Sequence, residues 1–256
     1  MRARVESRKK PATSAAARRP GRPGRGAVEA AGTVTPFLSR EHIIDRALEL
    51  TRQEPLAELS MVGLAREFGV TPALIHYYVG SRDDLVSGVV NRYFKARVER
   101  FAPPTGDWRR DLEDMARTTC AQMVEHGGVL RYIFSHNRFR LFQKVVPGET
   151  DYGMEFLDRS IRVFRDAGFG PKHAALGYHL LQQFVLAAAY AEVGRQLPAE
   201  HEEYVRERIT ATPKARYAAA HYVARTFSRL DAKTAFDAGL GLLLDGFAGW
   251  LGGTAR

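Results

Sequence analysis

The segment Ser60–Leu85, SMVGLAREFGVTPALIHYYVGSRDDL, contains the strongest structural signal in the chain. Apolar residues recur at helical spacing on both sides of Gly69, a residue that can adopt the positive φ of a tight turn. This pattern predicts two short helices that cross steeply and leave the second one projecting as a probe for the major groove of DNA. An ordinary helical hairpin inside an all-α core is the alternative interpretation. The predicted buried face consists of Leu64, Ala65, Phe68, Val70, Ile75 and Val79.

The flanking sequence continues the helical pattern in both directions. A first helix is expected from about Ser39 to Gln53, with Ser39 as its N-cap. Ser81 opens a further helix that runs to about Phe101, where two prolines stop it. No alternating strand pattern follows, so the predicted fold class is all-α. Later helices are expected at 106–126, 128–142, 152–167, 172–196, 214–228 and 232–251, with a loop or a short solvated helix at 199–213.

Composition excludes several classes of protein. The chain has 256 residues, of which 45% are hydrophobic, and its single cysteine, Cys120, permits neither an intrachain disulfide nor a thiolate metal cluster. No apolar run is long enough to span a bilayer and the N-terminus lacks a secretory signal, so we expect a soluble cytoplasmic protein with no membrane partner. The histidines show no metal-ligand spacing. Neither a metal nor a cofactor is predicted, and the absence of catalytic motifs argues against an enzyme.

The positive charge is concentrated at the N-terminus. Residues 1–26 contain nine Lys and Arg against Glu6 alone, a formal +8 of the total +9. With its Pro and Gly content, the segment 1–35 is predicted to be a disordered basic arm that binds polyanions. Its Gly21-Arg22-Pro23 core resembles an AT-hook, in which Arg22 and Arg25 would enter the minor groove. A tail that contacts phosphates without entering the groove is equally compatible with this composition.

The segment that follows the arm carries little net charge. Between Ser39 and Phe101, nine Lys and Arg are matched by nine Asp and Glu. The second helix of the pair, Thr71 to Tyr78, contains no Lys, Arg, Asn or Gln, which are the usual bidentate readers of purine edges. Readout would therefore use thymine methyl groups, hydroxyl and imidazole hydrogen bonds, and DNA shape. The expected contacts are Thr71, Pro72, Ala73, His76 and Tyr77.

Two assignments on this helix have alternatives. His76 could be an exposed histidine with no partner. Tyr78 could contact DNA or pack into the core, because its helical phase places it near Ile75. Arg82 is a further candidate, since it stands at the start of the next helix, where the helix N-terminus also favours an anion.

Residues 39–101 resemble the N-terminal DNA-binding domain of the TetR family of repressors, most clearly in the run LAREFGVTPALIHYYVGSRDDL. The segment FDAGLGLLLDGF, residues 236–247, resembles the last helix of tetracycline-repressor-like members. The resemblance implies that Arg82 binds a phosphate. It also shows departures: His76 stands where the family usually has Tyr, Tyr78 where it has His, and Gly80 where Lys is common.

The family resemblance also implies the domain organisation. A three-helix, helix-turn-helix DNA-binding domain would span 36–101, and a helical effector-binding and dimerisation domain would span 102–256. The helices at 172–196 and 232–251 would pair with a second copy, although both could instead be internal core. The effector pocket would lie among the middle helices, where core packing is the alternative role of each candidate residue. These candidates are Phe134, His136, Phe139, Tyr178 and Gln182.

The function that these features predict is sequence-specific transcriptional regulation. A homodimer would bind a double-stranded DNA operator and be released, as a repressor, by a small-molecule effector. The alternative is an effector-independent or architectural DNA-binding protein that relies on the AT-hook-like arm. An all-α enzyme is a third possibility, for which the sequence offers no catalytic constellation.

Overall fold

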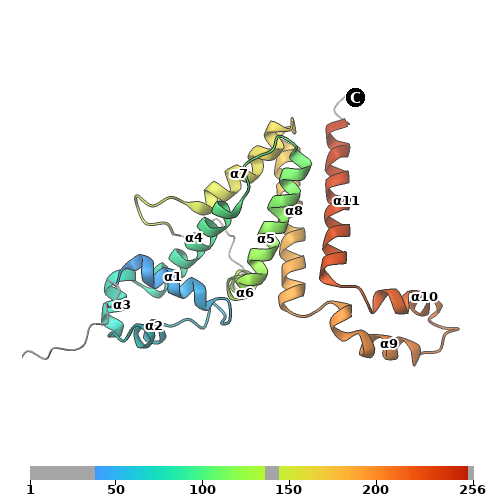
Figure 1. Cartoon of the computed structure of the whole chain (residues 1–256), viewed down its shortest axis with the longest axis horizontal. Coiled ribbons are helices and arrows are strands. Elements are labelled where there is room, and N and C mark those ends of the chain that lie inside the picture. Colours follow the sequence, from blue (N-terminus) through green and yellow to red (C-terminus); the bar gives the residue numbers. More distant parts are fainter. Residues whose placement is uncertain (1–37, 136–143, 253–256) are drawn as a thin grey trace, which may run out of the picture. The chain divides into compact units, whose positions relative to one another are not determined.

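The described part of the chain is helical and contains no strand (Figure 1). The computed structural model describes residues 38–135 and 144–252, so the predicted basic arm, with Arg22 and Arg25, lies outside it. The predicted all-α fold class is confirmed. The helices are α1 (Arg40–Leu50), α2 (Met61–Phe68), α3 (Pro72–Val79), α4 (Arg82–Arg100), α5 (Trp108–Glu125), α6 (Gly127–Ser135), α7 (Tyr152–Asp166), α8 (Pro171–Val193), α9 (Glu202–Thr210), α10 (Ala218–Phe227) and α11 (Ala232–Gly252).

Serine caps begin three of the first four helices. The Ser39 hydroxyl accepts a hydrogen bond from the backbone N–H of His42 at 3.2 Å, and that of Ser60 accepts one from Gly63 at 2.9 Å. Ser81 forms a capping box, in which its hydroxyl accepts from the Asp84 N–H at 3.2 Å and the Asp84 carboxylate accepts from the Ser81 N–H at 2.9 Å. The predicted helix starts are therefore confirmed.

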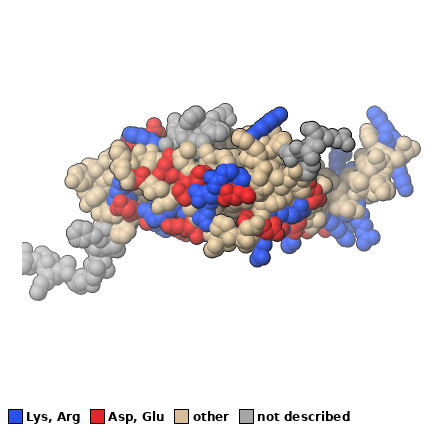
Figure 2. Space-filling model, turned by 90° about the horizontal axis from the view of Figure 1, so that it is seen from above, with Lys and Arg blue, Asp and Glu red and all other residues tan. Residues whose placement is uncertain are grey.

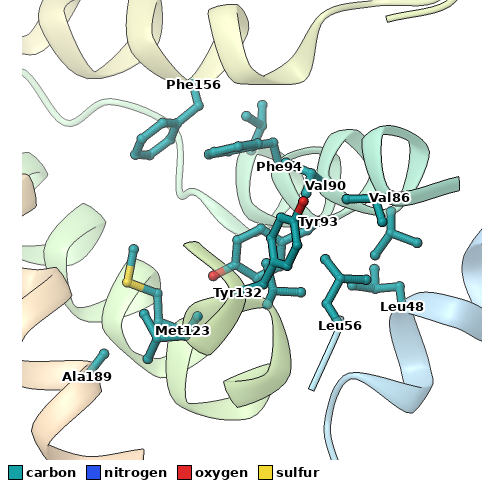
Figure 3. Close-up of a cluster of buried hydrophobic side chains, with 14 of the residues drawn as sticks. Leu48, Leu56, Val86, Val90, Tyr93, Phe94, Met123, Tyr132, Phe156 and Ala189 are labelled. Carbon is teal, nitrogen blue, oxygen red and sulfur yellow. The ribbon is translucent and has the colours of Figure 1, made fainter. Parts of the chain in front are cut away.

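One continuous core joins the first helices to the rest of the chain. Figure 3 shows Leu48 and Leu56 beside Val86 and Val90 of α4, with Tyr93 a turn further on. The other end of α4 packs against α7, where the rings of Phe94 and Phe156 lie 5.7 Å apart. Because α4 contacts both regions, a shift of this helix changes the packing of both.

Helices α5, α7, α8 and α11 form the larger part of the core. Helix α8 packs against α5, α7 and α11, and α9 and α10 extend from the α8–α11 pair (Figure 1). Helix α11 was expected either to pair with a second copy or to be internal core, and its residues Leu240, Leu244 and Phe247 are buried within the chain. Phe247 packs on Phe164 of α7, with ring centroids 5.6 Å apart, so this part of the α11 surface serves the subunit itself. None of the helices described is long and apolar enough to cross a membrane.

Two helix boundaries differ from the sequence prediction. Helices were expected at 106–126 and 128–142 with a break at Gly127-Gly128, but the break lies at His126 and both glycines form the first turn of α6. A Cβ on Gly128 would lie 2.0 Å from the carbonyl oxygen of Glu54, so glycine permits a close backbone approach here. In the segment 199–213 the expected short solvated helix is observed: a 3-10 turn, Pro198–His201, leads into α9, which has no buried residue. Helix α10 begins at Ala218 because Pro213 first closes a separate turn with Arg216.

Candidate DNA interface

Helix α3 projects from a turn of defined backbone geometry. Helix α2 ends at Gly69 in the left-handed conformation, with φ at 66°, and the N–H of Val70 then donates to the carbonyl of Ala65 at 2.9 Å. Pro72 occupies the first position of α3. The side chain of Thr71, at the N-cap, makes no capping hydrogen bond, which leaves its hydroxyl available to a ligand.

The two faces of α3 have opposite roles. Ile75 and Val79 are buried against α2 and the core. The outer face carries every contact residue predicted on this helix, and Tyr77 projects furthest, with 80% of its surface exposed. Tyr78 is half-buried and packs against the core, with its ring edge-on to Tyr77 at 5.3 Å. Packing is thus the role observed for Tyr78. The exposed residues are Thr71, Pro72, Ala73, Leu74, His76 and Tyr77.

His76 has a defined partner on its own helix. Its Nδ1 lies 3.0 Å from the carbonyl oxygen of Gly80. A carbonyl only accepts, so Nδ1 must carry the hydrogen, and the outward Nε2 remains for another contact. In the neutral ring, Nε2 accepts from the amino group of adenine or cytosine, and in the cation it donates to a phosphate. His76 is exposed, as both interpretations expect, and the partner that it has is on its own helix.

Gly80 and Arg82 shape the start of α4. Gly80 has a φ of 83°, and a Cβ there would lie 2.8 Å from Oδ2 of Asp84, which explains glycine at a position where the family commonly has Lys. Arg82 is exposed, and its Nη2 donates to the Ala57 carbonyl at 2.5 Å. This bond ties α4 to the α1–α2 linker. The remaining guanidinium N–H groups are available for a phosphate.

Most Lys and Arg residues between Ser39 and Phe101 form ion pairs. Six of the nine between Ser39 and Phe101 pair with carboxylates, and Figure 2 shows cations and acids interspersed on the face in view. Arg97 is buried. The other two, Arg66 and Arg82, are exposed, and within the described ranges no carboxylate pairs with either. Sequence reasoning missed Arg66, because only the folded structure shows which cations are neutralised.

The segment before α7 is bonded to α1 and α4. We call residues 144–151 the α6–α7 connector. Its Lys144 binds Asp84 with Nζ to Oδ1 at 2.9 Å, and Glu149 pairs with Arg40 of α1. The side-chain amide of Asn91 donates to the Thr150 carbonyl at 3.0 Å, and its oxygen accepts from the N–H of Tyr152, the first residue of α7, at 3.0 Å. Hydrogen bonds from Ser81, and then from Lys144, hold the pKa of Asp84 far below its usual range.

A second connection joins the start of α6 to the end of α1. The N–H of Gly128 donates to the Thr51 carbonyl at 2.9 Å, and its carbonyl accepts from the N–H of Leu56 at 3.3 Å. Beside it, Glu125 pairs with Arg100 and Arg52. The hydrogen bond from Arg100 is the largest cause that lowers the Glu125 pKa to about 2. We call these contacts the α1–α6 strut.

The residues predicted to bind an effector fall at different places. Tyr178 and Gln182 lie one turn apart on α8, the first half-buried near Phe156 and the second buried. Phe134 of α6 contacts Tyr190, with ring centroids 4.3 Å apart, and Tyr190 is twelve residues beyond Tyr178, about 18 Å along the helix. Phe134 therefore does not lie beside Tyr178. His136 and Phe139 lie outside the described residues.

A cavity of about 370 Å³ lies elsewhere, between the α4–α5 linker, α5 and α7, and none of the three predicted effector residues that the structure describes, Phe134, Tyr178 and Gln182, lines it. Within the described ranges, no group of three or more His, Cys, Asp or Glu side chains is placed to hold a metal ion.

Comparison with known families agrees with this architecture. Residues 102–250 match the family "Tetracyclin repressor-like, C-terminal domain", and residues 43–95 match "Bacterial regulatory proteins, tetR family". The chain belongs to the TetR family. This assignment confirms the resemblance seen in the sequence around α2 and α3, and members of this family are transcriptional regulators rather than enzymes.

Individual TetR-family relatives cover different parts of the chain. The HTH-type transcriptional repressor Rv1353c of Mycobacterium tuberculosis is 34% identical over 99 residues, which are 38% of this chain and only 36% of that relative's length. ActR of Streptomyces coelicolor without ligand superimposes with a TM-score of 0.69 and 25% identity, over 85% of this chain and 98% of ActR. ActR in complex with actinorhodin gives 0.67 and 26%, over 86% and 99%.

Proposed function

We propose that this chain is a transcriptional repressor that binds operator DNA as a homodimer and leaves it when a small molecule binds the C-terminal part. The observation that carries the proposal is the outer face of α3. A short helix, fixed by α2 at its back, presents a continuous exposed surface with a threonine, a histidine and a tyrosine on it. A helix held in this way is suited to enter the major groove.

Different residues would contact the bases and the phosphates of the operator. Thr71, His76 and Tyr77 supply hydrogen bonds to base edges or phosphates, while Pro72 and Ala73 pack on thymine methyl groups. Phosphate contacts come from Arg82, from Arg66 and from the basic arm. The arm, with Arg22 and Arg25, supplies most of the charge, because the region around α3 keeps few cations free of carboxylates.

The α6–α7 connector and the α1–α6 strut provide the route from effector to DNA. Residues 36–101 act as the DNA-binding unit and residues 102–256 as the effector-binding and dimerisation unit. The connector leads into α7 and bonds to α1 and α4, and the strut joins the start of α6 to the end of α1. A ligand that moves α6 or α7 would therefore act on α1 and α4, which pack against α3.

Pairing of two copies is supported by apolar side chains left on α8 and α11. Leu176 and Leu180 lie one turn apart on α8 and are 41% and 37% exposed, and Leu242 of α11 is 75% exposed. Two such pairs of helices bury these residues across a twofold axis. The axis also places two copies of α3 for the two halves of an operator.

The alternatives receive less support. Rv1353c is a repressor by name, and ActR has been solved with actinorhodin, so relatives of known type favour a ligand-responsive repressor over an architectural DNA-binding protein. The same relatives favour a regulator without catalytic activity. A protein of this kind acts where the chromosome is, in the cytoplasm.

Selection of bound fragments from genomic DNA tests the proposal. The wild-type chain is expected to enrich one site with two related halves, and a variant with Tyr77→Ala is expected to lose that enrichment while keeping its melting temperature. A screen of small molecules for release of the selected fragment then tests the response to an effector. Enrichment without any common sequence would show that the chain is not an operator-specific repressor.

A further inference from the structure

We propose that the cavity between the α4–α5 linker, α5 and α7 is a binding site for a small organic cation with an apolar body. This inference deepens the proposed function, on which it rests for the role of the ligand, by naming a site and a chemical class. The cavity measures about 370 Å³. Sites for small molecules occupy roughly 300–1,000 Å³, so the space suits a compact ligand.

The floor of the cavity is apolar and aromatic. Its residues come from the end of α4, from α5 and from α7, and Trp108 is held edge-on by Phe169 with ring centroids 5.5 Å apart. An indole ring attracts cations to its face, in addition to burying apolar surface. The apolar lining includes Phe101, Trp108, Met115 and Val163.

The charged lining is predominantly negative. Four carboxylates line the cavity against two guanidinium groups, which leaves a net charge of −2. An anionic ligand would meet repulsion there, and a cation would be attracted. The charged residues are Asp111, Asp114, Glu155, Asp166, Arg159 and Arg162.

Both arginines are engaged with the protein itself. Arg159 donates to the carbonyl oxygens of Val98 at 3.0 Å and of Ala102 at 3.4 Å, and so satisfies groups left open by the end of α4. Arg162 pairs with Asp158, one turn earlier on α7, which does not line the cavity. Arg162 also interacts electrostatically with Glu155 and Asp166, so it offsets part of their charge, and the lining keeps its net charge of −2.

Two carboxylates remain to meet a ligand. Asp111 accepts hydrogen bonds from the N–H and the hydroxyl of Thr105, and Asp166 pairs with the arginine before it. Asp114 of α5 and Glu155 of α7 have no such partner within the described residues. They belong to two different helices, so a cation in the cavity can be approached by carboxylates from both.

The position of the cavity is compatible with the proposed dimer. No residue of α8 or α11 lines it, so pairing of those helices with a second copy leaves it open. The set of side chains described does not form a metal site either, which makes an organic cation the better match to the apolar floor.

Intrinsic fluorescence tests the proposal directly. The chain has two tryptophans, Trp108 and Trp250, so a Trp250→Phe variant leaves the cavity residue as the only one. The probes are benzyltrimethylammonium, its uncharged isostere neopentylbenzene, and benzenesulfonate. Saturable change of Trp108 fluorescence is expected with the cation, and weaker change with the uncharged probe. The anion should give none.

Substitutions then locate the binding charge. In the Trp250→Phe background, Asp114→Asn with Glu155→Gln should weaken binding of the cation about tenfold and leave the uncharged probe unaffected. Glu203→Gln with Glu207→Gln, on α9, removes the same charge at a distance and should change neither. Circular dichroism melting confirms that each variant folds. If the double variant does not fold, Glu155→Gln alone is used, with an expected loss of about threefold.

Several results would overturn the proposal. These are equal affinity for the cation and its uncharged isostere, a preference for the anion, no saturable response, or unchanged cation binding after the α5 and α7 substitutions. The fluorescence assay contains no DNA. If the cation changes Trp108 fluorescence but no small molecule releases an operator, the proposed function is contradicted and this inference stands. If a small molecule releases the operator but the cation does not change Trp108 fluorescence, this inference is contradicted and the proposed function stands.

Discussion

Replacement of Gly128 by alanine tests the α1–α6 strut. The added Cβ would lie 2.0 Å from the carbonyl oxygen of Glu54 and 2.8 Å from that of Thr51. Both atoms belong to the backbone, so the conflict cannot be relieved by rotation of a side chain. The start of α6 must move away from the end of α1, and the hydrogen bonds of Gly128 to Thr51 and Leu56 lengthen or break.

The expected cost follows from the two kinds of interaction that Gly128→Ala disturbs. Each buried backbone hydrogen bond contributes about 1 kcal/mol. Overpacking at a buried site costs about 1–3 kcal/mol. The free energy of unfolding should therefore fall by about 3–5 kcal/mol. In a chain of this size each kcal/mol moves the Tm by about 2–4 °C, so a decrease of roughly 10 °C is expected.

Thermal melting and urea unfolding, followed by circular dichroism, measure the effect. Gly127→Ala is the matched control, because its Cβ would lie 3.0 Å from Cγ1 of Val193, a side chain that can adjust. That variant should stay within about 1 kcal/mol of the wild type, since alanine also favours the helix. A Gly128→Ala protein as stable as the Gly127→Ala protein would refute the reasoning about backbone approach.

Three further predictions concern the DNA interface and its connections. Tyr77→Ala should lower operator affinity about tenfold without changing the Tm, whereas Tyr78→Ala should lower the Tm; equal melting losses in the two variants would contradict the assignment of faces. Deletion of residues 1–26 should weaken DNA binding and make it less dependent on salt. The slope of log K against log salt concentration should decrease by about 0.9 for each phosphate that the arm neutralises. An unchanged slope would exclude the arm from the interface. The pKa of Glu125 is lowered from 4.5 to about 2, so its contribution to stability is complete above the unfolded value and is lost as the pH falls towards 2. Urea unfolding at a series of pH values should show that the free energy of unfolding falls less at acid pH in Glu125→Gln than in the wild type. The same pH dependence in both proteins would count against a stabilising role of the Glu125 ion pairs.

Local chemistry made the N-terminal helices predictable. A serine that caps a helix acts on N–H groups within three residues, and so Ser39, Ser60 and Ser81 marked helix starts correctly from sequence alone. The outward face of α3 followed in the same way from helical phase. Tyr78 could not be resolved, because its phase lies between the two faces and the packing of distant residues decided its position.

Features that depend on contacts between residues far apart in the sequence were not predictable. Two adjacent glycines, 127 and 128, indicated an interruption, but the constraint on Gly128 comes from a carbonyl more than seventy positions earlier in the chain. Arg66 could not be distinguished among nine cations, since nothing in its sequence neighbourhood shows that the others are paired. The cavity beside Trp108 was missed for the same reason, as its carboxylates come from two helices that meet only in the fold.

In the proposed repressor, the ion pairs explain why a DNA-binding unit with little net charge would need the basic arm. Arg40 pairs with Glu149, and Arg52 and Arg100 pair with Glu125, so three cations of residues 39–101 hold the C-terminal part rather than phosphates. Such pairs on a surface are worth up to about 1 kcal/mol each and exchange readily, which suits contacts that the proposed effector response would break. Cations that pair with carboxylates of the C-terminal part cannot at the same time bind DNA phosphates. Nine Lys and Arg in residues 1–26 supply charge that lies outside the switching contacts, so affinity and response can be altered independently.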